Sequence, residues 1–176
     1  MKIRFAQVVP FLLIATALCA EEAPGPIKVG GFTFTVPEGW RSVTPSSPMR
    51  KAQLEIARGP AKAEVTFFQF GREEGGSAAD NVARWYAQFP SSDDKHITEN
   101  VQVGAVKITF AMTEGTFSSG MPGGPTTPMN DYALLGAIIE HSGGNVFVKM
   151  TGPAAVVKGA REKFMEFIST ALAKKD

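Results

Sequence analysis

The amino-acid sequence predicts an α+β domain in which an antiparallel sheet of about six or seven strands carries packed helices. Three observations support this fold class. Apolar and polar residues alternate over several short segments, which is typical of half-buried strands. Two other segments repeat apolar residues every three or four positions and are each bounded by a proline, which indicates helices. Most connections between the strand segments are short and rich in Gly and Pro, which favours hairpins.

The N-terminal third of the chain predicts three strands. Residues 32–36 alternate Phe or Val with Thr, and the Pro-Glu-Gly turn at residues 37–39 ends this half-buried strand. Residues 49–57 and 64–70 are expected to pair across the Gly-Pro turn at residues 59–60. These strands are therefore expected to form an antiparallel arrangement.

A helix is expected between Ser77 and Pro90. Asp80 lies three positions after Ser77, a spacing that caps a helix and places negative charge near its N-terminal dipole. Apolar residues then recur at helical spacing until Pro90 ends the helix. They are Ala78, Val82, Trp85, Tyr86 and Phe89. Residues 96–101 and 105–117 follow as two more strands.

The remaining segment contains the main irregularity of the pattern. Residues 118–130 are rich in Gly and Pro and predict a long loop, a kind of segment that is often functional. Residues 132–140 are apolar on both faces, which predicts a central strand. Residues 146–151 form the last strand, and Pro153 introduces a final helix that is expected to dock on the sheet.

The first twenty residues have the pattern of a secretory signal. Lys2 and Arg4 precede an apolar run at residues 8–18. This run is about ten residues long, whereas a membrane span needs about twenty. We therefore expect cleavage near Ala20, a periplasmic or secreted protein, and no transmembrane span once the signal is removed.

The mature chain is expected to consist of a short tether at residues 21–29 and a single domain at residues 30–174. Cys19 leaves open an alternative in which the protein is a lipoprotein anchored through this residue. Leu18 disfavours the lipid anchor, because lipoprotein signals carry a small residue at that position.

The charge and cysteine content exclude several classes of function. Removal of the signal lowers the 18 basic side chains to 16, against 17 acidic ones. A nearly neutral chain without a Lys/Arg stripe disfavours nucleic acid as a partner. Loss of the single cysteine with the signal excludes disulfides, thiol catalysis and Cys-ligated metals from the folded part, and we expect no cofactor.

The opening of the domain resembles that of PsbP-like and related small exported proteins. The residues that carry this resemblance are Gly31, Phe34, Pro37, Gly39 and Trp40, together with Phe164, Phe167, Ile168 and Leu172 of the closing helix. The order of elements agrees from about Gly30 to Leu172, and the chain is similar to secreted bacterial proteins of unassigned activity. The resemblance implies an α/β/α sandwich with an accessory or binding role, and it implies no catalytic residue.

Residue types suited to hydrolysis are present without a motif. His96 lies in a charged loop and His141 beside a Gly-Gly hairpin, positions typical of solvated turns. The sequence lacks the G-x-S-x-G pattern of a nucleophile elbow. An envelope hydrolase with a Ser/His/Asp site assembled by folding, for example from Ser118, His141 and Asp131, remains the alternative function.

Two further ligands are disfavoured. Residues 71–76 precede a helix as a phosphate loop would, but Glu73 and Glu74 would repel phosphate. Met121 and Met129 offer thioethers suited to Cu(I), but the sequence has no repeated Met-x-x-Met cluster.

A protein partner in the cell envelope is the favoured ligand, and the long loop is its expected contact surface, helped by the segment between Trp40 and Arg50. Trp40 beside Arg50 suits a peptide or anion site, although core packing is the favoured interpretation for a large aromatic residue. The predicted partner-binding residues are Trp40, Arg50, Phe117, Met121, Met129 and Tyr132. The sequence thus predicts an exported, non-enzymatic accessory or binding domain.

Overall fold

The computed structural model describes residues 25–72, 74–90, 92, 95–119 and 127–173. The strands are β1 (Ile27–Val29), β2 (Phe32–Phe34), β3 (Trp40–Val43), β4 (Ala52–Arg58), β5 (Ala61–Gln69), β6 (Ile97–Val103), β7 (Val106–Ser119), β8 (Thr127–Glu140) and β9 (Val146–Pro153). The helices are α1 (Ala78–Tyr86), α2 (Ala154–Gly159) and α3 (Arg161–Ala173). The expected signal at residues 1–20 lies outside the described residues.

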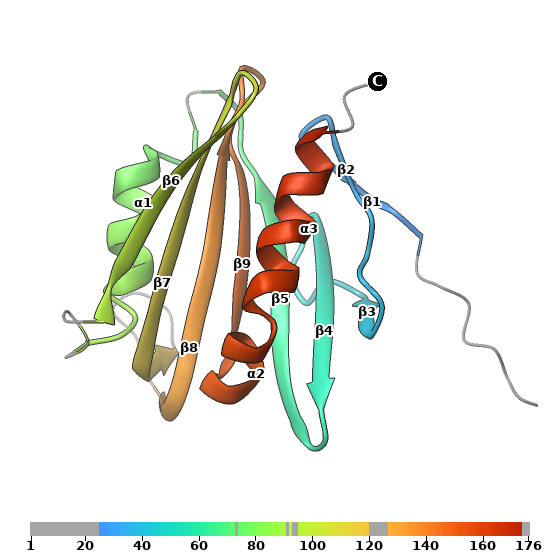
Figure 1. Ribbon diagram of the computed structural model, residues 1–176. Helices are drawn as coiled ribbons and strands as arrows, with labels where there is room; N and C mark the ends of the chain where they lie inside the picture. The colour runs from blue at the N-terminus through green and yellow to red at the C-terminus, as the bar shows by residue number, and fades with distance from the viewer. Residues whose placement is uncertain (1–24, 73, 91, 93–94, 120–126, 174–176) are drawn as a thin grey trace, which may run out of the picture.

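Seven strands form one antiparallel sheet in the order β3-β4-β5-β9-β8-β7-β6 (Figure 1). The chain runs through β3, β4 and β5, and α1 then carries it to the opposite edge of the sheet at β6. From there it returns strand by strand until β9 pairs with β5. β1 and β2 pair separately. The predicted α+β class, with six or seven antiparallel strands and packed helices, is confirmed.

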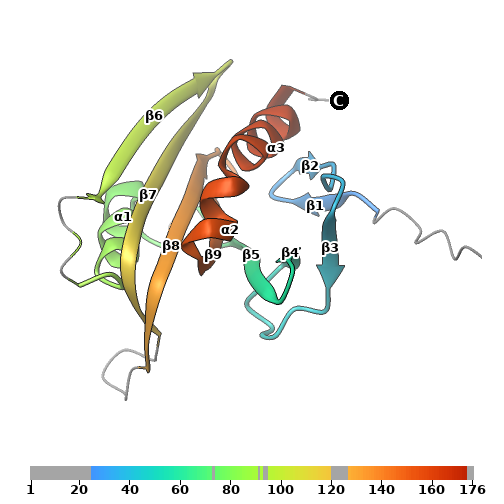
Figure 2. The ribbon, with the colours of Figure 1, turned by 60° about the horizontal axis from the view of Figure 1, so that its bottom comes forward.

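The helices lie on both faces of the sheet. Figure 2 shows α1 on one side, and α2, α3 and the β1-β2 pair on the other. The larger apolar cluster lies under α3, where Phe167 contacts both Phe34 and Phe67. A second cluster under α1 contains Trp85 and Phe147. Full burial of one such Phe side chain contributes about 2 to 3 kcal/mol, so both clusters hold the α/β/α layers together.

β8 is the central strand that its sequence predicts. It lies between β7 and β9, and its residues from Ala133 to Ile139 are buried. Gly136 faces Trp85 so closely that a side-chain carbon at this position would overlap the indole ring. The missing side chain therefore lets α1 pack directly on the sheet.

Residues 120–126 of the long loop expected at residues 118–130 lie outside the described residues, and the two ends of this loop are strand. β7 continues to Ser119 and β8 begins at Thr127, and Ser118 pairs with Pro128. β8 pairs with β9 only from Tyr132 onward, so Pro128 lies on an edge where its missing N–H costs no ladder hydrogen bond. Strand pairing therefore extends into a segment whose Gly and Pro content had predicted a loop.

Three other segments differ from the expectation. Ile27–Val29, expected in the tether, form β1, and Trp40–Val43, expected to have no regular structure, form the edge strand β3. The single final helix is divided into α2 and α3, which meet at Ala160. Short edge strands with polar residues give little alternating pattern, which explains why the sequence did not reveal them.

The predicted start of α1 is confirmed in detail. The Ser77 Oγ accepts the Asp80 N–H at 3.1 Å, and the Asp80 carboxylate accepts the Ser77 N–H at 3.4 Å. The hydrogen bond from the Ser77 hydroxyl lowers the pKa of the Asp80 carboxyl. This reciprocal cap satisfies two N–H groups and fixes the helix start.

Candidate functional site

Four of the predicted partner-binding residues gather on the face of the sheet that carries α1. They are Arg50, Phe117, Met129 and Tyr132. Trp40 lies on the other face, where it is 5% exposed and its ring centroid is 5.4 Å from that of Phe167. Trp40 is therefore a core residue, in agreement with the packing interpretation. Met121 lies outside the described residues.

A β-bulge brings the apolar members of this group together. Gly115 pairs with Tyr132 and Phe117 with Met129, so β8 has one residue more than β7 between the two pairs. Asp131, in this extra stretch, has a φ of 55°. On a regular strand, residues three positions apart point to opposite faces. The bulge therefore places Met129 and Tyr132 on the same face.

The three apolar side chains form a continuous wall. The rings of Phe117 and Tyr132 are stacked, with centroids 6.0 Å apart and planes 6° apart. Phe117 also packs against Phe89 at 5.2 Å, which ties the wall to the segment after α1. Met129 and Tyr132 are only partly buried. Their outer edges are therefore available to another molecule.

This wall borders a cleft of about 320 Å³, which we call the Tyr132 groove. Its opposite wall comes from β3, β4 and β5. The groove is lined by Val43, Gln53, Glu55, Lys62, Ala63, Glu64, Phe117, Met129, Tyr132, Thr151 and Gly152. Its two sides thus differ in character, one apolar and the other polar and charged.

Arg50 contacts two residues that line the polar side of the groove, Gln53 and Glu64. Its guanidinium donates to Glu64 Oε2 at 3.0 Å and to Gln53 Oε1 at 2.9 Å. Gln53 Nε2 completes the network by donating to the same Glu64 oxygen at 3.3 Å. A guanidinium held in this way loses less conformational entropy when a partner binds.

A second ion-pair group extends the polar side. The Glu55 carboxylate pairs with Arg41 at 2.6 Å and with Lys62 at 3.0 Å. Hydrogen bonds, first from Arg41 and then from Lys62, lower the pKa of the Glu55 carboxyl. These side chains project from neighbouring strands and present both signs of charge along the groove.

Lys149 lies on the same face, between the groove and α1. Its Nζ donates to Gln88 Oε1 at 2.9 Å and lies 5.8 Å from the centre of the Phe117 ring. Burial, only partly offset by the Glu64 charge, lowers the pKa of Lys149 to about 8. The Gln88 backbone carbonyl also accepts the Ser118 N–H at 2.7 Å. Gln88 thus connects the segment after α1 to both β7 and β9.

Thr151 contributes a buried hydroxyl to the groove. The side chain is 7% exposed, and its Oγ1 has no hydrogen-bond partner within the described part of the chain. A buried hydroxyl without a partner costs roughly 1 to 3 kcal/mol. Thr151 is one of the groove residues, with Gln53 and Glu64, that the sequence did not single out.

The structure separates the residues named for a hydrolase. Asp131 and His141 stand about ten residues apart along the extended β8, and each strand residue advances about 3.3 Å, so they are about 30 Å apart. Ser118 lies at the Asp131 end. His141 instead accepts the Gly143 N–H and packs its ring on Phe32. Ser118, Asp131 and His141 therefore do not meet.

The phosphate-loop interpretation gains no support, and the Cu(I) interpretation is not tested because Met121 lies outside the described residues. The Glu74 carboxylate accepts the Gly71 N–H, so it occupies an amide that a phosphate loop would offer to the anion. Within the described ranges, no group of three or more His, Cys, Asp or Glu residues is arranged to hold a metal ion. Met129 lies beside Phe117 in the apolar cluster.

None of the helices formed by the described residues is long and apolar enough to cross a bilayer.

Comparison with known proteins identifies a fold relationship. No protein-family model and no curated protein matches the chain. The solution structure of the cyanobacterial PsbP protein CyanoP from Synechocystis sp. PCC 6803 matches with a TM-score of 0.51 and 12% identity, over 79% of this chain and 84% of that one. This similarity shows a PsbP-like fold.

A crystal structure of PA94 from Pseudomonas aeruginosa, described as a protein of unknown function and putative regulator, matches with a TM-score of 0.48 and 14% identity. That match covers 82% of this chain and 93% of that one.

Proposed function

We propose that this protein is an exported, non-enzymatic binding domain of the cell envelope that captures a protein partner at the Tyr132 groove. The observation that carries the proposal is the convergence of Phe117, Met129 and Tyr132 opposite Gln53 and Glu64, which the Arg50 guanidinium holds in place. These residues come from distant parts of the chain and meet on a part of the sheet that borders an open cleft.

The composition of the groove favours a protein partner. Tyr, Phe, Met and Arg are enriched in protein interfaces, and Tyr and Arg are frequent hot spots. Tyr132 is held by its stack on Phe117, and Arg50 by Glu64. Rigid anchors of this kind bind with little loss of side-chain entropy. The ion pairs around Glu55 would form the polar rim of the interface.

Export belongs to the same proposal and rests on the basic and apolar pattern of residues 1–20. We expect signal cleavage near Ala20 and a periplasmic or secreted protein. Mass spectrometry of the N-terminus of the protein purified from its native host tests this. A diacylated Cys19 would instead assign the lipoprotein alternative, and an uncleaved Met1 would contradict export.

Affinity capture from the native envelope tests the groove. We expect the Tyr132→Ser and Arg50→Ala variants to lose most of the proteins that the wild type retains. Ile97→Ser and Arg58→Ala are the matched controls, because both change residues on the opposite face of the sheet and should retain these proteins. Thermal unfolding of every variant separates loss of binding from loss of fold. Equal capture by the groove variants and the wild type would contradict the proposal.

A further inference from the structure

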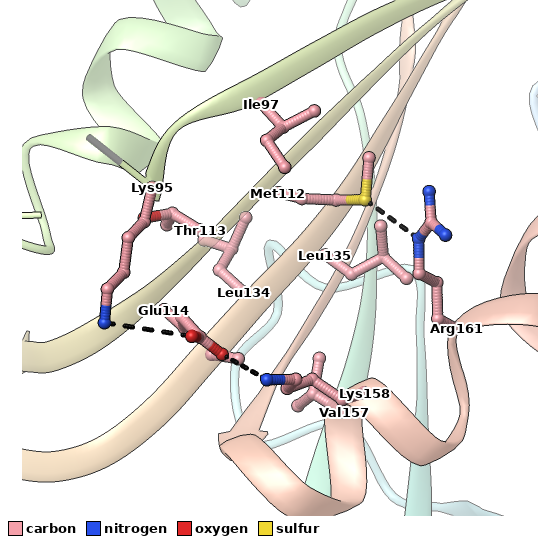
Figure 3. Close-up of a pocket in the computed structure, with 11 residues that line it drawn as sticks. Lys95, Ile97, Met112, Thr113, Glu114, Leu134, Leu135, Val157, Lys158 and Arg161 are labelled. Atoms are coloured by element: carbon pink, nitrogen blue, oxygen red, sulfur yellow. Dashed lines mark hydrogen bonds and ion pairs between the residues drawn. The ribbon is translucent and has the colours of Figure 1, made fainter. Parts of the chain in front are cut away.

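The opposite face of the sheet contains a second and larger cavity, of about 500 Å³, between the strands β6 to β8 and the helices α2 and α3 (Figure 3). We call it the Arg161 pocket. The side chains of Ile97, Met112, Leu135 and Val157 supply its apolar wall. Ligand cavities in proteins have volumes of about 300 to 1,000 Å³, so this cavity is large enough for a small molecule.

The apolar wall is incompletely covered by the protein itself. Ile97 is 51% exposed although it is a large aliphatic residue. It pairs with Met112 across β6 and β7, so the two side chains form a continuous apolar strip on the inner face of this edge. Covering such a strip with a hydrocarbon chain would remove apolar surface from water and thereby favour binding.

The rim of the pocket is predominantly cationic. Lys95 and Lys158 both approach the carboxylate of Glu114, at 3.8 and 2.9 Å. The hydrogen bond from Lys158 is the main cause of a lowered pKa of Glu114. Arg161 pairs with Glu99 at 3.4 Å. Among the described residues, these three cations share two carboxylates.

Arg161 is the residue best placed to receive an anion. Its Nε donates to the thioether sulfur of Met112 at 3.2 Å, as the dashed line in Figure 3 shows. A thioether is a weak acceptor, whereas a guanidinium forms its strongest hydrogen bonds with a carboxylate that accepts two at once. Arg161 also begins α3, and the N-terminal end of a helix dipole favours negative charge.

We propose that the Arg161 pocket binds a single-chain fatty acid. The carboxylate would replace the Met112 sulfur as the acceptor of Arg161, and the hydrocarbon chain would cover Ile97, Leu135 and Val157. This site lies on the other face of the sheet from the Tyr132 groove and does not depend on the function proposed for that groove.

Calorimetric titration with dodecanoate, below its micelle concentration, tests this proposal. The wild type should bind one equivalent. Dodecanol lacks the charge and should bind at least tenfold more weakly, because it cannot form the charge-assisted hydrogen bond with Arg161. Acetate lacks the chain and should give no measurable binding.

Variants separate the two parts of the site. Arg161→Gln should lower dodecanoate affinity about tenfold or more, and Ile97→Ser several-fold, because they remove the anion donor and part of the apolar wall. Arg58→Gln and Tyr132→Ser leave the pocket intact and should bind as the wild type does. Absence of dodecanoate binding, or equal affinity in wild type and Arg161→Gln, would overturn the proposal, as would equal affinity for dodecanol.

Discussion

Lys149 Nζ donates a hydrogen bond to Gln88 Oε1 at 2.9 Å, beneath the wall of the Tyr132 groove. Burial removes water from this ammonium group, and the nearby Glu64 charge only partly compensates, so the pKa of Lys149 is about 8. An unfolded lysine has a pKa of about 10.4. The protein therefore holds a cation on the groove face at a cost in stability.

This difference predicts how stability depends on pH. Between pH 8 and about 10.4 the unfolded state binds more protons than the folded state, so the free energy of unfolding rises with pH. The destabilisation is complete below pH 8 and amounts to about 3 kcal/mol. We expect Lys149→Met to be more stable than the wild type at pH 7, with an advantage that shrinks as pH rises from 8 to 10.4.

Urea unfolding at several pH values measures this convergence. Lys107→Met is the control for loss of a surface lysine, because the Lys107 side chain is 51% exposed. A constant difference between wild type and Lys149→Met across the window would show that burial does not lower the pKa of Lys149. NMR titration of its ε-methylene signals provides a direct second measurement.

The packing of α1 predicts a cost for any side chain at Gly136. A Cβ there would overlap the Trp85 ring, so Gly136→Ala must displace the helix or the indole. Overpacking of this kind costs about 1 to 3 kcal/mol. Thermal unfolding should show a lowered Tm, whereas Gly25→Ala, which meets no atom within 4 Å, should leave it unchanged. An unchanged Tm in Gly136→Ala would show that α1 does not pack this closely.

The fold followed from local patterns wherever those patterns were strong. The double-sided apolar run of β8 predicted a central strand, and the Ser77 and Asp80 pair predicted the start of α1; both are present. The sequence pattern did not predict strands at β3 and at the end of β7. Pairing with a neighbouring strand, rather than local composition, determines the structure there. Edge strands carry too few buried positions to show an alternation.

The groove was predictable only in part. Large apolar residues beside the Gly- and Pro-rich segment pointed to Phe117, Met129 and Tyr132, but strand alternation would place Met129 and Tyr132 on opposite faces. The bulge brings these two side chains to the same face. A bulge depends on the register between two strands and not on local composition, so the sequence did not reveal it. Glu64 and Thr151 were missed because alternating polar residues on a strand equally indicate a solvated face.

The bulge predicts that one substitution at Asp131 is harmful and another is tolerated. This residue has a φ of 55°, which Gly adopts freely and a β-branched residue does not. Asp131→Val should lower the free energy of unfolding by about 1 to 2 kcal/mol and weaken capture at the groove, because Met129 would lose its position. Asp131→Gly should preserve both properties. Chemical unfolding and affinity capture measure them, and equal behaviour of the two variants would exclude a structural role for this bulge.

Replacement of Thr151 by Val separates an effect on the stability of the fold from an effect on partner capture. Its buried Oγ1 has no partner in the described residues, so Thr151→Val should leave the fold as stable as before or stabilise it by about 1 kcal/mol. Thr109 is equally buried, at 5% exposed, but donates to Asn100 Oδ1 at 2.9 Å, so Thr109→Val should be destabilising. If a partner in the Tyr132 groove satisfies the Thr151 hydroxyl, Thr151→Val will also weaken capture while Tm is maintained or raised. Destabilisation equal to that of Thr109→Val would instead show that the Thr151 hydroxyl is already satisfied within the fold.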